Sequence, residues 1–308
     1  MSELVQRVAL KVEYLGEKFC GSQMQRAGIR TVQSELESAL NTFFRCDSRL
    51  IKATFSGRTD TGVHALGQIV HFDLPESVLR RIRITEGNSG MVSKTEAAEI
   101  GDLNEVLSDL FLEKMCWAIN GIVGKDLAIA DAQLVPQDFH ARFSATRRSY
   151  VYRILNRPQR SAVRQANQCF VSAKLDHDAM KRSLECLLGR HDFEAFKSSN
   201  ADKVSTICLV DRAELLNKGE AELEFWISAN HFVYNMVRII VGTLLEVGLG
   251  KRAPTAFSEA LAGKDRHLAG PTAPPWGLCL YSVDYPAEFS LFQRDSKIEI
   301  SKSQENES

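Results

Sequence analysis

Asp60 is the first candidate for chemistry, because it stands in a polar stretch that combines a carboxylate with a guanidinium and three glycines. The stretch covers residues 56–68, with Arg58 two positions before Asp60. Gly57 and Gly62 permit positive φ angles or the close approach of a substrate. A carboxylate held in this way can stabilise developing positive charge or form a covalent bond with a substrate. The same residue types also form ordinary hairpin turns, so the stretch alone leaves both interpretations open.

A second stretch, residues 139–153, mixes basic and aromatic side chains. Its charged and aromatic members include Arg142, Arg147, Arg148, Tyr150, Tyr152 and Arg153. From residue 149 onward the pattern alternates as in a strand, which predicts that the two tyrosines share one face. Interleaved basic and aromatic groups suit a groove that follows a phosphate backbone and stacks a base. Tyrosines in strands are also common core residues, so packing is the alternative role.

Arg238 is the third candidate, because it is the exception in the segment 231–242, which enters a largely apolar helix. The segment predicts a helix that is apolar on nearly every side. A guanidinium in such a helix needs either a carboxylate partner or a route for its tip to reach solvent. The residues themselves leave both possibilities open.

Taken together, the three stretches resemble the tRNA pseudouridine synthase A family. The run Gly57-Arg58-Thr59-Asp60-x-Gly62-Val63-His64 is similar to the family signature, in which the aspartate is catalytic. The resemblance implies that Tyr150 contacts the target base and that Arg238 pairs with Asp60. It also implies conversion of uridine to pseudouridine at positions 38, 39 and 40 of the tRNA anticodon stem-loop, by a homodimer that needs no cofactor and no metal. An early loop departs from the family, with Leu15 and Ser22 where an aspartate and an aromatic residue are usual.

This activity gives each candidate a chemical task. Breaking the bond between C1′ and N1 of uridine develops positive charge on the sugar, which an ionised Asp60 can stabilise or capture. A nearby Arg238 favours the charged carboxylate and is expected to lower its pKa. The freed uracil must rotate without escaping, and stacking on Tyr150 suits that need. Arg58 is the candidate for filling the space that a flipped uridine leaves, and Arg142, Arg147 and Arg148 are the candidates for contacting RNA.

Two other functions compete with this interpretation. Asp60-Thr61-Gly62 is also the motif of aspartic proteases, in which two carboxylates share a proton, but the sequence holds only one copy. A tRNA-binding protein without catalysis would keep the basic segments but would have no need for Asp60 beside Arg238. Release of tritium from C5 of uridine distinguishes the proposed enzyme from both.

The composition indicates an ordinary globular protein that contacts RNA through local patches. The 308 residues are 44% hydrophobic and 25% charged, with a formal net charge of −1, which is not the strongly basic balance of a general nucleic-acid binder. No apolar run is long enough to span a membrane, and the first residues do not start a signal peptide, which predicts a cytoplasmic location. The seven cysteines are scattered, which favours reduced thiols over a zinc site.

The elements that must position these groups alternate between strands and helices. Apolar residues at every second position from Val8 to Tyr14 predict a strand, and Thr31 is placed to cap a helix. The order strand, helix, strand recurs later, which predicts an α+β fold. By resemblance this is the pseudouridine synthase fold, with two similar α/β halves, mainly antiparallel sheets and the active site in the cleft between them. The predicted halves are 1–141 and 142–288, with a polar insertion at 85–102 and a disordered tail at 289–308.

Overall fold

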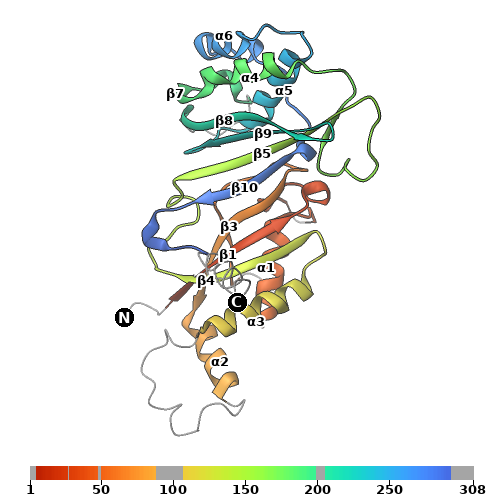
Figure 1. Cartoon of the computed structure of the whole chain (residues 1–308). Coiled ribbons are helices and arrows are strands. Elements are labelled where there is room, and N and C mark those ends of the chain that lie inside the picture. Colours follow the sequence, from red (N-terminus) through yellow and green to blue (C-terminus); the bar gives the residue numbers. More distant parts are fainter. Residues whose placement is uncertain (1–4, 27, 48–49, 88–106, 199–204, 293–308) are drawn as a thin grey trace, which may run out of the picture.

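One continuous sheet runs through the whole molecule. The computed structural model describes residues 5–26, 28–47, 50–87, 107–198 and 205–292. Its ten-stranded sheet follows the order β4-β1-β3-β10-β5-β9-β8-β7, with β2 paired to β3 and β6 paired to β5 (Figure 1). Neighbours along the main path are antiparallel, apart from the parallel pair of β3 and β10. The predicted α+β class is confirmed.

Strand β1 follows the predicted alternation of buried and exposed residues except at Ala9, which was predicted on the exposed face and is buried. In β1 the side chains of Val8, Leu10, Val12 and Tyr14 are buried, whereas Glu13 is exposed. The strands are β1 (Val5–Tyr14), β2 (Thr54–Phe55), β3 (His64–Pro75), β4 (Leu127–Val135), β5 (Arg147–Asn156), β6 (Cys169–Val171), β7 (Gly189–Asp192), β8 (Ile207–Gly219), β9 (Glu222–Ala229) and β10 (Leu278–Asp284).

The helices gather at the two ends of the sheet. Helices α4, α5 and α6 lie beyond β8, and α1, α2 and α3 lie at the end that carries β1 and β4 (Figure 1). Their bounds are α1 (Val32–Phe43), α2 (Glu76–Gly87), α3 (Asp109–Ile122), α4 (His177–Leu184), α5 (Met236–Gly248) and α6 (Ala256–Gly263). The predicted cap of α1 is confirmed, because the Thr31 hydroxyl accepts the backbone N–H of Ser34 in a capping box.

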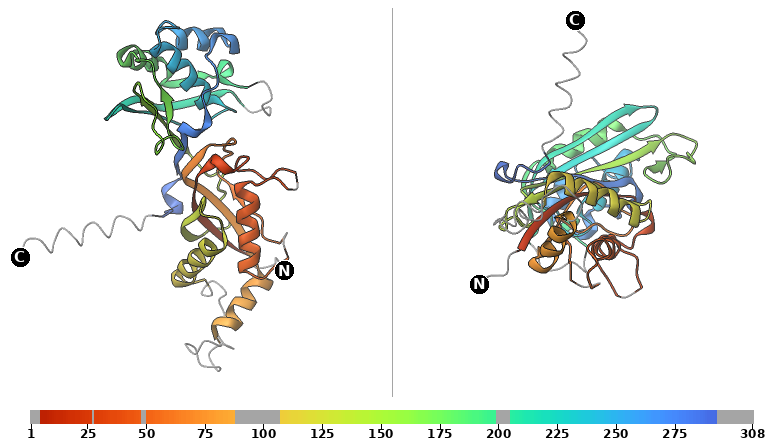
Figure 2. Two further views of the ribbon diagram at one scale, coloured as in Figure 1. Left: turned by 90° about the vertical axis from the view of Figure 1, so that its right-hand side faces the viewer. Right: turned by 90° about the horizontal axis from the view of Figure 1, so that it is seen from below.

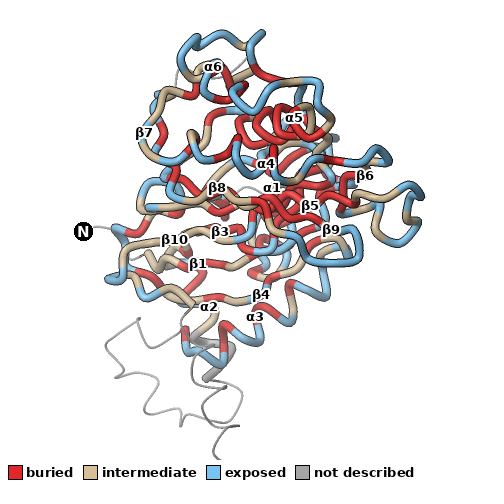
Figure 3. The backbone as a smooth tube through the Cα atoms, turned by 45° about the horizontal axis from the view of Figure 1, so that its top comes forward, coloured by how far each residue is buried: buried red, intermediate tan, exposed pale blue. Residues whose placement is uncertain are grey.

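Two hydrophobic cores meet where β10 enters the sheet. Leu280 of β10 belongs to the core that packs β1 and β3 against α1, and Leu278 belongs to the core around α5. Val63, from the polar loop that holds Asp60, packs into the second core. Figure 2 shows the two lobes that result, joined by the blue segment, and Figure 3 shows the buried residues concentrated along the strands and α5. The Asp60 loop therefore lies at the junction of the two lobes.

Two predicted segments lie only partly within the described residues. Helix α2 continues to Gly87, so the first residues of the predicted 85–102 insertion are helical, and residues 88–106 lie outside the description. Of the predicted tail, residues 289–292 are docked. Phe289 packs against Phe139 with ring centroids 5.2 Å apart, and the Phe292 N–H donates to Gln133 Oε1 at 2.8 Å. Residues 293–308 lie outside the description.

Candidate active site

The Asp60 loop, residues 56–63, is held by hydrogen bonds to an early loop of the chain. The Thr59 N–H donates to Ser22 Oγ at 2.8 Å, and the Ser22 N–H donates to Thr59 O at 3.0 Å. Tyr14 Oη and Thr59 Oγ1 are hydrogen-bonded at 2.8 Å. Gly21, with φ +89, permits this approach, because a Cβ there would lie 3.0 Å from Thr59 O. Ser22, which departs from the family pattern, therefore anchors the residue before Asp60.

His64 anchors the other end of the loop. Its Nδ1 accepts the Gly16 N–H at 3.0 Å, so Nε2 carries the proton and donates to Trp276 O at 3.0 Å. Burial lowers the pKa of His64, which favours this neutral form. Sequence reasoning missed this role, as it missed that of Gln68, whose amide donates to Gly57 O at 3.0 Å. A rigid frame of this kind fixes where Asp60 points.

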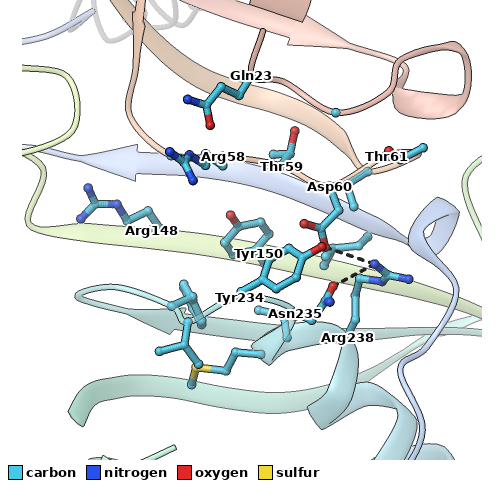
Figure 4. A pocket seen from close by; sticks show the side chains of 18 of the residues that line it. Gln23, Arg58, Thr59, Asp60, Thr61, Arg148, Tyr150, Tyr234, Asn235 and Arg238 are labelled. Atoms are coloured by element: carbon cyan, nitrogen blue, oxygen red, sulfur yellow. Dashed lines mark hydrogen bonds and ion pairs between the residues drawn. The ribbon is translucent and has the colours of Figure 1, made fainter. Parts of the chain in front are cut away.

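Arg238 reaches Asp60 from the opposite side of the cavity. Its NH1 donates to Asp60 Oδ2 at 3.1 Å and to Asn235 Oδ1 at 3.0 Å (Figure 4). Its Nε donates to Ala273 O at 2.8 Å. The loop that carries Ala273 lies directly on α5, because a Cβ on Gly242 would meet Pro271 O at 1.7 Å. The ion pair between Asp60 and Arg238 is present as the resemblance implied. Its catalytic role stays a prediction.

The pKa of Asp60 moves in the direction opposite to the one expected. Burial raises it above the ordinary value, and the hydrogen bond and charge of Arg238 only partly oppose this effect. The two side chains are 21% and 17% exposed, so the carboxylate has lost most of its hydration in exchange for a single hydrogen bond from the guanidinium. The protein therefore holds Asp60 as a poorly solvated carboxylate, which suits interaction with a cationic group.

Asp60 and Arg238 open into a cavity of about 550 Å³. Tyr150 lines it, with its ring edge-to-face on Phe232 at a centroid distance of 5.1 Å. Tyr234, to which the sequence reasoning gave no role, is half exposed and faces the same space (Figure 4). The cavity has room for one base and its sugar. The wall also includes Gln23, Arg58, Arg142, Arg148 and Lys197.

The predicted RNA-contacting arginines divide between the cavity and other surfaces. Arg58 is exposed at the cavity, and Arg142 also lines it. Arg148 lines the cavity too, but its guanidinium donates to four backbone carbonyls. It therefore holds those backbone segments together, and its main contribution to the cavity is positive charge. Arg147 does not line the cavity, because its side chain pairs with Asp211 at 2.8 Å and Asp284 at 3.5 Å.

Comparison with known proteins decides the family. The family described as tRNA pseudouridine synthase matches residues 184–286, a range that contains Arg238. The tRNA pseudouridine synthase A of Halalkalibacterium halodurans is 39% identical over 274 residues, covering 89% of this chain and 90% of the relative. This chain belongs to the tRNA pseudouridine synthase A family. Its members in Shouchella clausii and Colwellia psychrerythraea are 39% and 35% identical, covering 91% and 92% of this chain and 93% and 96% of those relatives.

Membership in the tRNA pseudouridine synthase A family agrees with the geometry and not with the protease alternative. Asp60 pairs with a guanidinium, and within the described residues it does not pair with a second carboxylate with which it could share a proton. Among the described residues, no group of three or more His, Cys, Asp or Glu side chains could hold a metal ion. All seven cysteines are free thiols. In the described part of the chain, no helix is long and apolar enough to cross a membrane.

Proposed function

We propose that this protein isomerises uridine to pseudouridine in tRNA, at positions 38, 39 and 40 of the anticodon stem-loop, with Asp60 acting at C1′. The observation that carries the proposal is the partly buried Asp60 carboxylate, paired with Arg238 and open to a cavity lined by Tyr150. The names of the relatives, whose sequences align with most of this chain, support the reaction and tRNA as its substrate.

The reaction rearranges one nucleoside and needs no second reactant. The bond between C1′ and N1 breaks, and its electron pair leaves with uracil, so positive charge develops at C1′. The Asp60 carboxylate either stabilises that charge or forms a bond to C1′. The uracil then turns and C5 bonds to C1′, and if Asp60 had bonded to C1′, that bond breaks and the carboxylate is released. C5 then loses its proton, and N1, which carried the electron pair, gains one. The proton lost from C5 is the one that a tritium label reports.

The remaining cavity residues support the handling of the base and the RNA. Tyr150 has one face toward the cavity, and in the described part of the chain its hydroxyl has no hydrogen-bonding partner, so stacking and polar contact with uracil are both available to it. Arg58 projects from the same loop as Asp60, which suits it to replace a uridine drawn out of a stem. Arg142 and Arg148 supply positive charge for the RNA backbone.

The resemblance further supports a homodimer that acts in the cytoplasm without a cofactor or metal. Light scattering on the purified protein tests the dimer directly, because a monomer and a dimer differ twofold in mass. Full activity after dialysis against a chelator tests the independence from metals.

The decisive experiment is tritium release from C5-labelled tRNA by Asp60→Asn under single-turnover conditions. The substitution keeps the size of the side chain and removes its charge. We expect a loss larger than the roughly 10²- to 10⁴-fold typical of a missing general acid or base, with tRNA binding retained. Asp178→Asn, an exposed aspartate on α4, is the matched control and should release tritium normally. Release by Asp60→Asn within tenfold of wild type would exclude the proposed role.

A further inference from the structure

Phe143 is the most exposed phenylalanine in the described part of the chain, with 78% of its surface accessible. Its ring lies on the imidazole of His140, at a centroid distance of 4.4 Å and an interplanar angle of 33°. The guanidinium of Arg142 lies 5.9 Å from the ring centroid. A bare aromatic surface beside a cation is the combination that stacks bases in proteins that bind single-stranded RNA.

The backbone around Phe143 is fixed by its own hydrogen bonds. His140 Nδ1 accepts the N–H groups of Arg142 and Phe143, at 3.1 Å and 3.2 Å. The His140 N–H donates to Ser144 Oγ, and the Ser144 N–H donates to His140 O, both at 2.9 Å. Burial, together with the charges of Arg7 and Arg142, lowers the pKa of His140, which keeps Nδ1 an acceptor. The backbone that carries the ring is therefore fixed before any ligand arrives, so binding orders little of the loop.

The loop that carries Phe143 is joined directly to the active site. Arg148 donates to Arg142 O at 2.6 Å and also to Ser56 O, at the start of the Asp60 loop, at 3.2 Å. Arg142 itself lines the cavity. Phe143 is not itself among the residues that line the cavity, but its ring lies beside Arg142, which belongs to the positively charged part of the cavity wall. This continuity of charge favours an RNA segment over a protein partner at this position.

We propose that Phe143 is a stacking platform for an unpaired base of the RNA, on a nucleotide close to the target uridine, with Arg142 contacting the adjoining phosphate. The inference rests on the proposed function, because it assumes that RNA occupies the cavity. Phenylalanine has no hydrogen-bonding group in its side chain, so the platform accepts any base and contributes affinity and alignment rather than sequence choice.

The test is a titration with an unmodified anticodon stem-loop RNA, performed in the Asp60→Asn background so that the RNA is not converted. Removal of one base–aromatic stack by Phe143→Ala should weaken binding about 5- to 150-fold. Phe143→Leu keeps an apolar side chain without a π face, and it should bind the RNA as weakly as Phe143→Ala. Phe143→Trp should restore binding. Trp117→Ala, which removes a 76% exposed ring on α3 away from the cavity, is the matched control and should bind normally.

A second measurement reports stacking itself. The tryptophan introduced by Phe143→Trp should lose fluorescence when the RNA binds, relative to the same protein with Phe143. Wild-type affinity of Phe143→Ala or of Phe143→Leu, or unchanged emission from Phe143→Trp, would overturn the platform. A change in mass by light scattering in Phe143→Ala would overturn it too, because the ring would then belong to a contact between protein chains.

The outcomes separate this inference from the proposed function. If the wild-type protein releases no tritium from labelled tRNA and does not bind the stem-loop, the proposed function and the platform both fail. If the wild-type protein does both and the Phe143 variants bind normally, the platform alone is wrong.

Discussion

Asp60 and Arg238 lie 178 residues apart in the chain, and a hydrogen bond of 3.1 Å joins their side chains. The nitrogen that donates it, NH1 of Arg238, also donates to Asn235 Oδ1 at 3.0 Å. Asn235 occupies the left-handed region with φ 63, and its amide donates to Ser198 Oγ at 2.9 Å. The carboxylate, the guanidinium and the amide therefore form one chain of contacts, in which Asn235 positions Arg238.

Asn235→Gly should slow turnover without unfolding the protein. Glycine adopts the left-handed conformation without strain, so the substitution removes the two side-chain hydrogen bonds and preserves the backbone. Loss of alignment of Arg238 should lower kcat between about 10- and 100-fold with little change in KM. Lys264→Gly relaxes another left-handed residue, φ 52, which ends α6 and does not line the cavity, and is the control. Equal kcat values for the two variants would show that Asn235 has no positioning role.

The acid side of the pH–rate profile should report Asp60. Activity requires the ionised carboxylate, so the rate should fall as the pH decreases through the pKa of Asp60. Because burial raises that pKa, the fall should begin at a higher pH than for an exposed aspartate. Arg238→Gln removes the group that opposes burial and should move the fall to still higher pH. Single-turnover rates across pH provide the measurement, and an unshifted profile in Arg238→Gln would contradict the coupling.

The same shift predicts how Asp60 affects stability. A carboxyl whose pKa is raised in the folded protein contributes stability that is complete below the unfolded pKa and is lost as pH rises through the folded pKa. At neutral pH the charged Asp60 is therefore unfavourable for folding. The melting temperature of Asp60→Asn at pH 7 should be no lower than that of wild type. Any excess of the variant's melting temperature over that of wild type should shrink as the pH is lowered. A clear loss of melting temperature at pH 7 would mean that Arg238 depends on the charge of Asp60.

The salt dependence of RNA binding should separate Arg142 from Arg147. Each phosphate neutralised by the protein contributes about 0.7 to 0.9 to the slope of log K against log salt. Arg142→Gln should reduce the slope by about that amount, because Arg142 lines the cavity. Arg147→Gln should leave it unchanged, because Arg147 is paired with Asp211 and Asp284. A lower slope in Arg147→Gln would show that RNA displaces those carboxylates.

Tyr150→Phe should preserve tRNA binding and slow turnover. The phenyl ring still stacks and still meets Phe232, whereas the hydroxyl is lost. Burial raises the pKa of Tyr150 well above its ordinary value, so the group acts as a neutral phenol and not as a phenolate. Parallel measurements of kcat and of the tRNA dissociation constant check this. Normal turnover would reduce Tyr150 to a packing and stacking residue.

The sequence by itself determined the features that depend on neighbouring residues. The alternation in β1, the capping box at Thr31 and the glycine-flanked Asp60 loop are local, and each predicts its structure from a few adjacent side chains. The same holds for the resemblance of the Asp60 motif, because its residues are contiguous. The choice between carboxylate partner and solvent for Arg238 could not be made from its own helix.

Only the tertiary structure decided what depends on contacts between distant segments. Strand β10 enters between β3 and β5, and with it come the two cores that place α5 opposite the Asp60 loop. Arg147 and Arg148 are adjacent in sequence, yet Arg147 meets carboxylates while Arg148 lines the cavity, because successive side chains of a strand point to opposite faces. The pKa of Asp60 rose rather than fell for a related reason. Arg238 was visible in the sequence, but the desolvation that outweighs it exists only once both lobes have closed around the carboxylate.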